Sequence, residues 1–153
     1  MVKEARTRPG GRIVWNVDVT LNDSDKTVTV PVGKTWRVLS IHGQLIASGN
    51  AGNRVLTVVI SNATPTAIFP RASTAAVAAT QIGGIRLYAC LAPSTTVFQR
   101  YENTDYVTVA YSAPLPSEFY LEAGSTIRVY DQAAIDAAAD DLAVFIHYIE
   151  YDA

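Results

Sequence analysis

"VTVPVGKTWRVL", residues 28–39, and "FYLEAGSTIRVY", residues 119–130, are two versions of one pattern, placed near the two ends of a chain of 153 residues. Their alignment matches Gly33 with Gly124, and in both an arginine follows four residues later. In each version an apolar strand reaches a glycine that can take a positive φ, and a second strand leaves with an Arg-x-apolar alternation. A corner used once in each half of a domain is typical of a jelly roll, which contains two Greek keys. The alternative is that such corners recur by chance in β proteins.

Alternation of apolar and polar residues continues from Ile13 to Tyr151, and helical periodicity is nearly absent. Residues 13–21, "IVWNVDVTL", put five apolar side chains on one face, which indicates a strand with one buried side. Turn signals separate about nine or ten such strands. The sequence therefore predicts an all-β fold, a jelly-roll-like double-sheet sandwich or barrel.

Three local features refine this prediction. Gly43 interrupts the strand that starts at Thr35 and is interpreted as a bulge that switches its register. Residues 72–84, "ASTAAVAATQIGG", combine alanine with Ser, Thr and Gly and are interpreted as a long loop. We expect Trp36, in the first corner, to lie in the core.

The length of the chain suits one domain, and its start differs in character from the rest. Residues 1–12, "MVKEARTRPGGR", are basic and lack apolar periodicity, so we predict a flexible N-terminal arm followed by a single β-sandwich domain at 13–153. Arg6, Arg8 and Arg12 are expected to reach carboxylates on a neighbouring subunit or partner. The alternative is that the charged ends keep an apolar domain soluble.

Composition favours contacts with other proteins. Charged residues make up 17% of the chain against the roughly 25% usual for soluble domains, while 49% of residues are hydrophobic. Basic residues are few and are not interleaved with aromatics, so no nucleic-acid partner is expected. No secretory signal pattern and no run of about 20 apolar residues occurs, which predicts a soluble protein made in a cytoplasm and no membrane partner.

Residue types that carry chemistry are sparse. His42 and His147 are the only histidines, each in an apolar run, and they are interpreted as structural histidines with satisfied ring nitrogens. Cys90 is the only cysteine, so neither an internal disulfide nor a cysteine-rich zinc site can form. No serine nucleophile elbow or phosphate-binding glycine loop occurs. We predict no catalytic residue, no metal and no cofactor, although paired carboxylates that meet only in space stay open.

Two further groups of residues are candidates for binding. The acidic group near the C-terminus lacks the alternate-residue spacing of a calcium loop; it consists of Asp131, Asp136, Asp140 and Asp141. The tyrosines supply rigid, half-polar area that suits protein interfaces or sugar stacking, or they simply cover sheet faces; they include Tyr101, Tyr106, Tyr111, Tyr120, Tyr148 and Tyr151.

Residues 30–61 and 115–152 resemble a group of small virion proteins of tailed bacteriophages. The shared patterns are "PxGKxWRV", a Gly-Asn-Arg turn, "LPAGSxIRVxD" and a terminal "AxDDLxVxxxxEY". Glu122 stands where the third pattern has proline, and the middle of the chain matches none of them. These motifs are structural corners rather than chemistry.

The resemblance implies a non-enzymatic component of the virion, made in the host cytoplasm. The role it suggests first is a capsid decoration (cement) protein that binds the major capsid protein and copies of itself, often as a homotrimer. A tail or neck component is the alternative within this class. From another class, a carbohydrate-binding β-sandwich module would fit the tyrosines.

Overall fold

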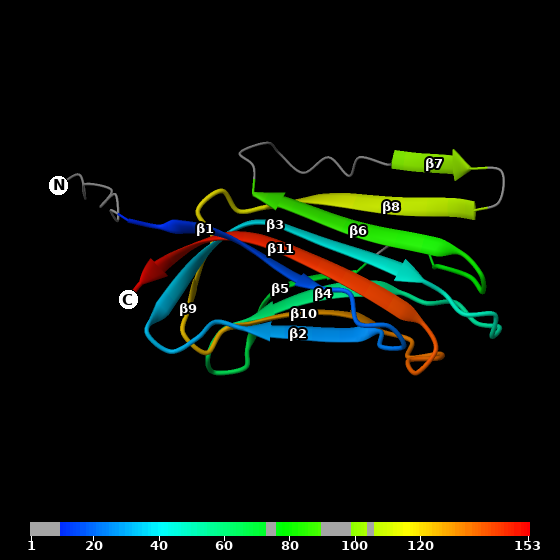
Figure 1. Ribbon diagram of the computed structural model, residues 1–153, viewed down its shortest axis with the longest axis horizontal. Coiled ribbons are helices and arrows are strands. Elements are labelled where there is room, and N and C mark those ends of the chain that lie inside the picture. Colours follow the sequence, from blue (N-terminus) through cyan, green and yellow to red (C-terminus); the bar gives the residue numbers. More distant parts are fainter. Residues whose placement is uncertain (1–9, 73–75, 90–98, 104–105) are drawn as a thin grey trace.

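The computed structural model describes residues 10–72, 76–89, 99–103 and 106–153, with side chains outside 71–75 and 90–113. These residues form two stacked sheets and contain no helix (Figure 1), so the predicted all-β, double-sheet fold is confirmed. The strands are β1 (Arg12–Asp18), β2 (Asp25–Thr29), β3 (Lys34–Ile46), β4 (Leu56–Ser61), β5 (Ala67–Ala72), β6 (Ile82–Ala89), β7 (Gln99–Asn103), β8 (Tyr106–Leu115), β9 (Tyr120–Glu122), β10 (Thr126–Asp131) and β11 (Asp141–Asp152).

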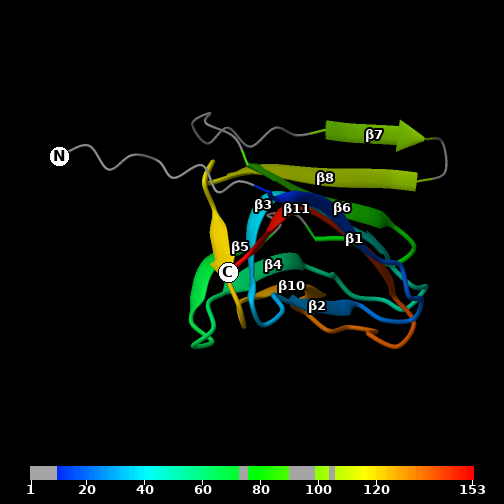
Figure 2. The same ribbon diagram turned by 60° about the vertical axis from the view of Figure 1, so that its left-hand side comes forward.

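The larger sheet has the order β1-β11-β3-β6-β8-β7, with β9 paired to the start of β3, and the smaller has the order β2-β10-β4-β5. Figure 2 shows the two layers nearly edge-on. Neighbouring strands are antiparallel except β6 and β8, which run parallel. That pair distinguishes the larger sheet from the antiparallel sheets of an ideal jelly roll.

The core lies between the sheets, because alternate side chains of the central strands point inward. Val38, Ile41 and Leu45 of β3 are buried there. The other sheet contributes Val58 and Val129, among others. The full cluster also contains Val30, Trp36, Leu56, Ile60, Phe69, Ile85, Leu87, Leu115, Leu121, Ile127, Leu142, Val144, Ile146 and Tyr148.

The repeated glycine corners lie side by side and pair with each other. Gly33 and Gly124 have φ values of +74° and +83°, so both take the conformation that glycine permits. The first corner leads from β2 to β3 and the second from β9 to β10, while β2 pairs with β10 and β3 with β9. Val30 connects the two corners by two hydrogen bonds: its N–H donates to Ser125 O at 2.9 Å, and its carbonyl accepts from Gly124 N at 2.9 Å. The chain therefore changes sheets twice at one place, which is why the pattern occurs twice.

The interpretation of Gly43 as a bulge is wrong. The register of β3 against β11 shifts between His147 and Tyr148, which leaves Leu39 as the extra residue. Gly43 instead allows a close approach of the sheets, since a Cβ there would lie 2.9 Å from Cγ1 of Val129.

The interpretation of residues 72–84 as one long loop is wrong at both ends of this segment, which belong to strands. β5 ends at Ala72 and β6 already begins at Ile82. Between them, Val77 forms a bridge with Arg54 and is buried. Residues 73–75 lie outside the described part of the chain.

Trp36 and Trp15 form a matched pair for testing the core. Trp36 is 2% exposed, as expected, and Trp15 is 62% exposed. We expect Trp36→Ala to lower the free energy of unfolding by about 3–5 kcal/mol, because it leaves a cavity and strips the Tyr148 ring of its stacking partner. Trp15→Ala should cost about 1 kcal/mol, the value of an exposed ring contact. Urea denaturation of both variants measures the difference, and equal losses would contradict this assignment of the core.

Candidate interaction surface

A run of exposed apolar side chains begins on the outer face of β1 and continues past the end of that strand at Asp18. Alternate residues from Ile13 onward are exposed by 63%, 62%, 52%, 54% and 65%; they are Ile13, Trp15, Val17, Val19 and Leu21, here called the β1 stripe. The sequence pattern placed these side chains on one face, but the expectation that this face is buried is wrong: it faces solvent, and no layer formed by the described residues covers it. Contiguous exposed apolar surface of this kind marks an interaction site.

Aromatic contacts extend the stripe across the sheet. Trp15 stacks on His147 of β11 with ring centroids 3.8 Å apart and planes 4° from parallel. In the next row, Phe145 stacks on His42 of β3 at 5.6 Å. The outer face therefore carries stacked rings on three adjacent strands, β1, β11 and β3.

The two histidines lie on the outer face of the larger sheet, and one of them differs from its prediction. His42 is half-buried, and this burial, together with the positive charge of Arg86, lowers its pKa and keeps it neutral near pH 7. His147 has a buried Nε2 with no hydrogen-bond partner in the described structure. Both thus belong to the aromatic outer face, and the expectation of satisfied ring nitrogens is wrong for His147.

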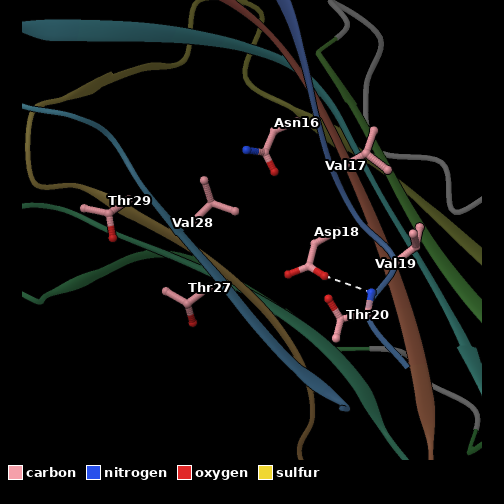
Figure 3. Close-up of a pocket in the computed structure, with 8 residues that line it drawn as sticks. All are labelled: Asn16, Val17, Asp18, Val19, Thr20, Thr27, Val28 and Thr29. Atoms are coloured by element: carbon pink, nitrogen blue, oxygen red, sulfur yellow. Dashed lines mark hydrogen bonds between the residues drawn. The ribbon is translucent and has the colours of Figure 1, made fainter. Parts of the chain in front are cut away.

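A shallow polar groove lies beside the stripe, between the edge strands β1 and β2 (Figure 3). Its volume is about 670 Å³, and its lining consists of Asn16, Val17, Asp18, Val19, Thr20, Thr27, Val28 and Thr29. The backbone N–H of Thr20 lowers the pKa of Asp18, and nearby Lys26 lowers it further. Lys26 is 2% exposed, with Nζ 3.2 Å from Asp18 and 3.1 Å from Asp23. Because the ammonium group of Lys26 offsets the negative charge of Asp18, the groove is polar without being strongly charged.

The residues predicted to bind a partner are only partly described. Arg12 opens β1 and donates Nη2 to Oε1 of Glu150 at 3.1 Å, while its side chain stays 75% exposed. It therefore has a partner within its own chain. Arg6 and Arg8 lie outside the described residues. Whether the three arginines form one site is thus not tested, and the arm at residues 1–12 stays a prediction.

Behind the surface, a buried ion pair fixes the loops at one end of the sandwich. Arg54 and Asp140 have fully buried side chains, and Nε and Nη2 of the arginine contact the two carboxylate oxygens at 2.9 and 3.1 Å. The remaining guanidinium hydrogens go to Ser48 Oγ, Asn50 O and Gly52 O. All five N–H donors of the guanidinium are thus satisfied.

The acidic residues near the C-terminus accept hydrogen bonds from neighbouring loops. Asp131 accepts from the N–H groups of Val55, Ala133 and Ile135. Asp136 accepts from Ser48 Oγ and Asn50 Nδ2, Asp140 from Ser48 N as well as the arginine, and Asp141 from Asn22 N. No group of three candidate metal ligands occurs within the described residues.

Sequence reasoning missed both the outward face of β1 and the buried ion pair. The ion pair had a signal: its arginine belongs to the Gly-Asn-Arg turn and its aspartate to the terminal "AxDDLxV" pattern. The stripe had none, because alternation separates two faces of a strand without saying which one is covered.

Helices able to cross a membrane are not found in the part of the chain that the structure describes.

Comparisons with known proteins leave the family open. No protein-family model matches the sequence, and no curated protein matches it. Among solved structures, the infectious bursal disease virus VP2 subviral particle aligns with 91% of this chain at 12% identity and a TM-score of 0.33. The Gx strain of that virus aligns at 11% identity and a TM-score of 0.31, and its T13 viral particle at 10% and 0.30.

This chain spans only 32% of the first of those chains and 38% of the other two. At such TM-scores the likeness assigns neither a family nor a function. The resemblance to tailed-phage virion proteins therefore stays a prediction based on sequence patterns.

The buried ion pair gives a stability prediction with a matched control. We expect Asp140→Asn to lower the free energy of unfolding by about 3–5 kcal/mol, because it leaves a buried guanidinium without its counter-charge. The control is Asp25→Asn, which breaks the Asp25–Arg128 pair, whose side chains are 45% and 46% exposed. That exposed pair should be worth about 1 kcal/mol or less. Urea titration at neutral pH measures both changes.

The stability difference between wild type and Asp140→Asn should depend on pH. Burial opposes ionisation of Asp140, but Arg54 and the Ser48 N–H outweigh it and hold its pKa below the ordinary value. A lowered native pKa contributes stability at neutral pH, and this contribution is lost as pH falls through that pKa. The gap between wild type and Asp140→Asn should therefore narrow below about pH 4. A gap that stays constant across the acid range would contradict the ionic origin of the stability.

Proposed function

We propose that this chain is a non-enzymatic structural protein of a virion, and specifically a decoration protein that binds the capsid lattice of a tailed bacteriophage. The observation that carries the proposal is the β1 stripe, five exposed apolar side chains at alternate positions along β1 and the segment that follows it. A monomeric protein gains nothing from displaying such a row to water. A protein that docks onto another protein buries it.

The energetics suit a contact repeated many times. Burying the exposed half of each stripe side chain contributes about 1 kcal/mol before the cost of association. A single contact of this size is weak. It becomes effective on a lattice when copies are linked, because each further contact then forms at a high effective concentration. A ligand that binds only the assembled shell also stabilises that shell by mass action.

The resemblance to phage virion proteins gains physical meaning from the fold. Its two glycine patterns are the corners that pair through Val30, and its other two patterns meet in the Arg54–Asp140 ion pair. All four patterns thus hold the sandwich together at its two ends. They support a shared scaffold, while the stripe between those ends supports the contact with a partner.

The position of the protein in the particle can be tested directly. Purified protein is added to capsid shells that lack it, from the virus whose genome encodes it; bound copies are counted, and both samples are heated. We expect saturation at a fixed number of copies per lattice unit and a higher rupture temperature. Attachment of a few copies at one vertex would instead identify a neck or tail component. Absence of binding to any virion part, with binding to a glycan array, would replace the proposal with the carbohydrate-binding alternative.

A charge placed in the stripe tests the surface itself. We expect Val17→Asp to weaken shell binding at least about tenfold, because a carboxylate would have to be desolvated in an apolar contact. The matched control is Val32→Asp, at a valine that is 95% exposed in the first glycine corner, outside the stripe. Thermal melts confirm that both variants fold. Equal shell binding by the two variants would show that the stripe is not part of the contact.

A further inference from the structure

The backbone edge of β1 is a second feature, separate from the side chains of the stripe. Among the described strands, β1 pairs only with β11, so its other side presents unpaired N–H and C=O groups. An edge strand in this state can add a strand from another molecule unless something blocks it. Seven residues pair along β1, with neither proline nor lysine among them.

The two edges of the smaller sheet are protected. β2, at the edge of the smaller sheet, carries Lys26 as a buried, inward-pointing charge. β5, at the opposite edge of that sheet, contains Pro70, which has no N–H to donate. Both devices prevent strand addition in natural sheets. Neither device occurs in β1, and its seven residues offer a longer free edge than the three residues of β9.

We propose that β1 pairs with β1 of a second copy, antiparallel about a twofold axis at Trp15, so that two larger sheets join into one. The sequence "RIVWNVD" is complementary to itself in this register. Trp15 lies opposite the partner copy's Trp15, Ile13 opposite its Val17, and Val14 opposite its Asn16. At the two ends, Arg12 lies opposite Asp18 of the other copy.

The end charges select this register from its neighbours. In an antiparallel pair, the numbers of two opposite residues always add up to the same value, which defines the register. Registers that keep both stripes on the same face have values that differ by two. One step in either direction places Arg12 opposite Asn16 or Thr20, which carry no charge, and only the register centred on Trp15 places it opposite a carboxylate. The side chains of Arg12 and Asp18 are 75% and 40% exposed, so each can reach another molecule while keeping its present partner. Such exposed pairs contribute little affinity but fix the register.

The contact is independent of the proposed function, since it forms in solution without a shell. Its effect on the stripe is direct: apolar residues of both copies become neighbours across the seam, with Trp15 beside Trp15. The exposed apolar area on that face would then be continuous over two molecules. A trimer would require a further contact, because a twofold seam joins copies only in pairs.

Single cysteines test the register. In a Cys90→Ser background, Trp15→Cys places two thiols directly opposite each other, where Cα atoms of paired strands lie about 5 Å apart. Ile13→Cys places its two thiols four residues out of register, about 13 Å apart, beyond the roughly 7 Å that a disulfide can bridge. We expect mild oxidation to yield a covalent dimer of the first variant and none of the second. A mixture of Ile13→Cys with Val17→Cys should yield the heterodimer.

Sedimentation of the unmodified protein completes the test. We expect its average mass to rise from monomer toward dimer with concentration, and circular dichroism checks that each cysteine variant keeps the β fold. Cross-linking of Ile13→Cys alone as readily as Trp15→Cys would overturn the register. A monomer at all concentrations, with no cross-linking of Trp15→Cys, would overturn the pairing itself and leave the edge to a strand of a different protein. Either result leaves the shell-binding measurement unaffected.

Discussion

Pairing between the two glycine corners is the constraint on which the rest of the sandwich depends. Through Val30, each corner holds the other in place at the point where the chain changes sheets. Strands β2 and β10 are thereby neighbours in one sheet, and β3 and β9 in the other. At the opposite end, the Arg54–Asp140 pair joins the loop after β3 to the loop before β11 (Figure 1). A core built mainly of Val, Ile and Leu fills the space between the paired corners and this ion pair.

Prediction from sequence succeeded where the cause is local. A glycine with positive φ, a two-residue alternation and a run of turns each depend on nearby residues, so the corners and the all-β class could be identified. The Arg54–Asp140 pair joins residues separated by 86 positions, and nothing local indicates that they meet. Gly43 shows the same limit, because its role is set by Val129 in the other sheet and not by its own strand.

The surface features have one origin: β1 lacks both a covering layer on its outer face and a neighbouring strand at its free edge. Its outer face shows apolar side chains where a covering layer would normally be, and its free edge shows backbone groups where another strand would be. The two deficits require different partners: side chains need an apolar surface, whereas backbone groups need another extended chain. A protein that works within an assembly, as proposed for this chain, can satisfy both needs with neighbouring molecules.

The position of β11 has a consequence for biosynthesis. This strand, close to the C-terminus of the sequence, lies between β1 and β3 and contributes Leu142, Val144 and Ile146 to the core. A ribosome delivers residues 141–152 only after both neighbouring strands have emerged, at about 5–20 residues per second. Until then a strand is missing between β1 and β3, so the sheet can close only after residues 141–152 have emerged. Formation of this sheet therefore waits for β11, and until β11 emerges the facing edges of β1 and β3 stay unpaired.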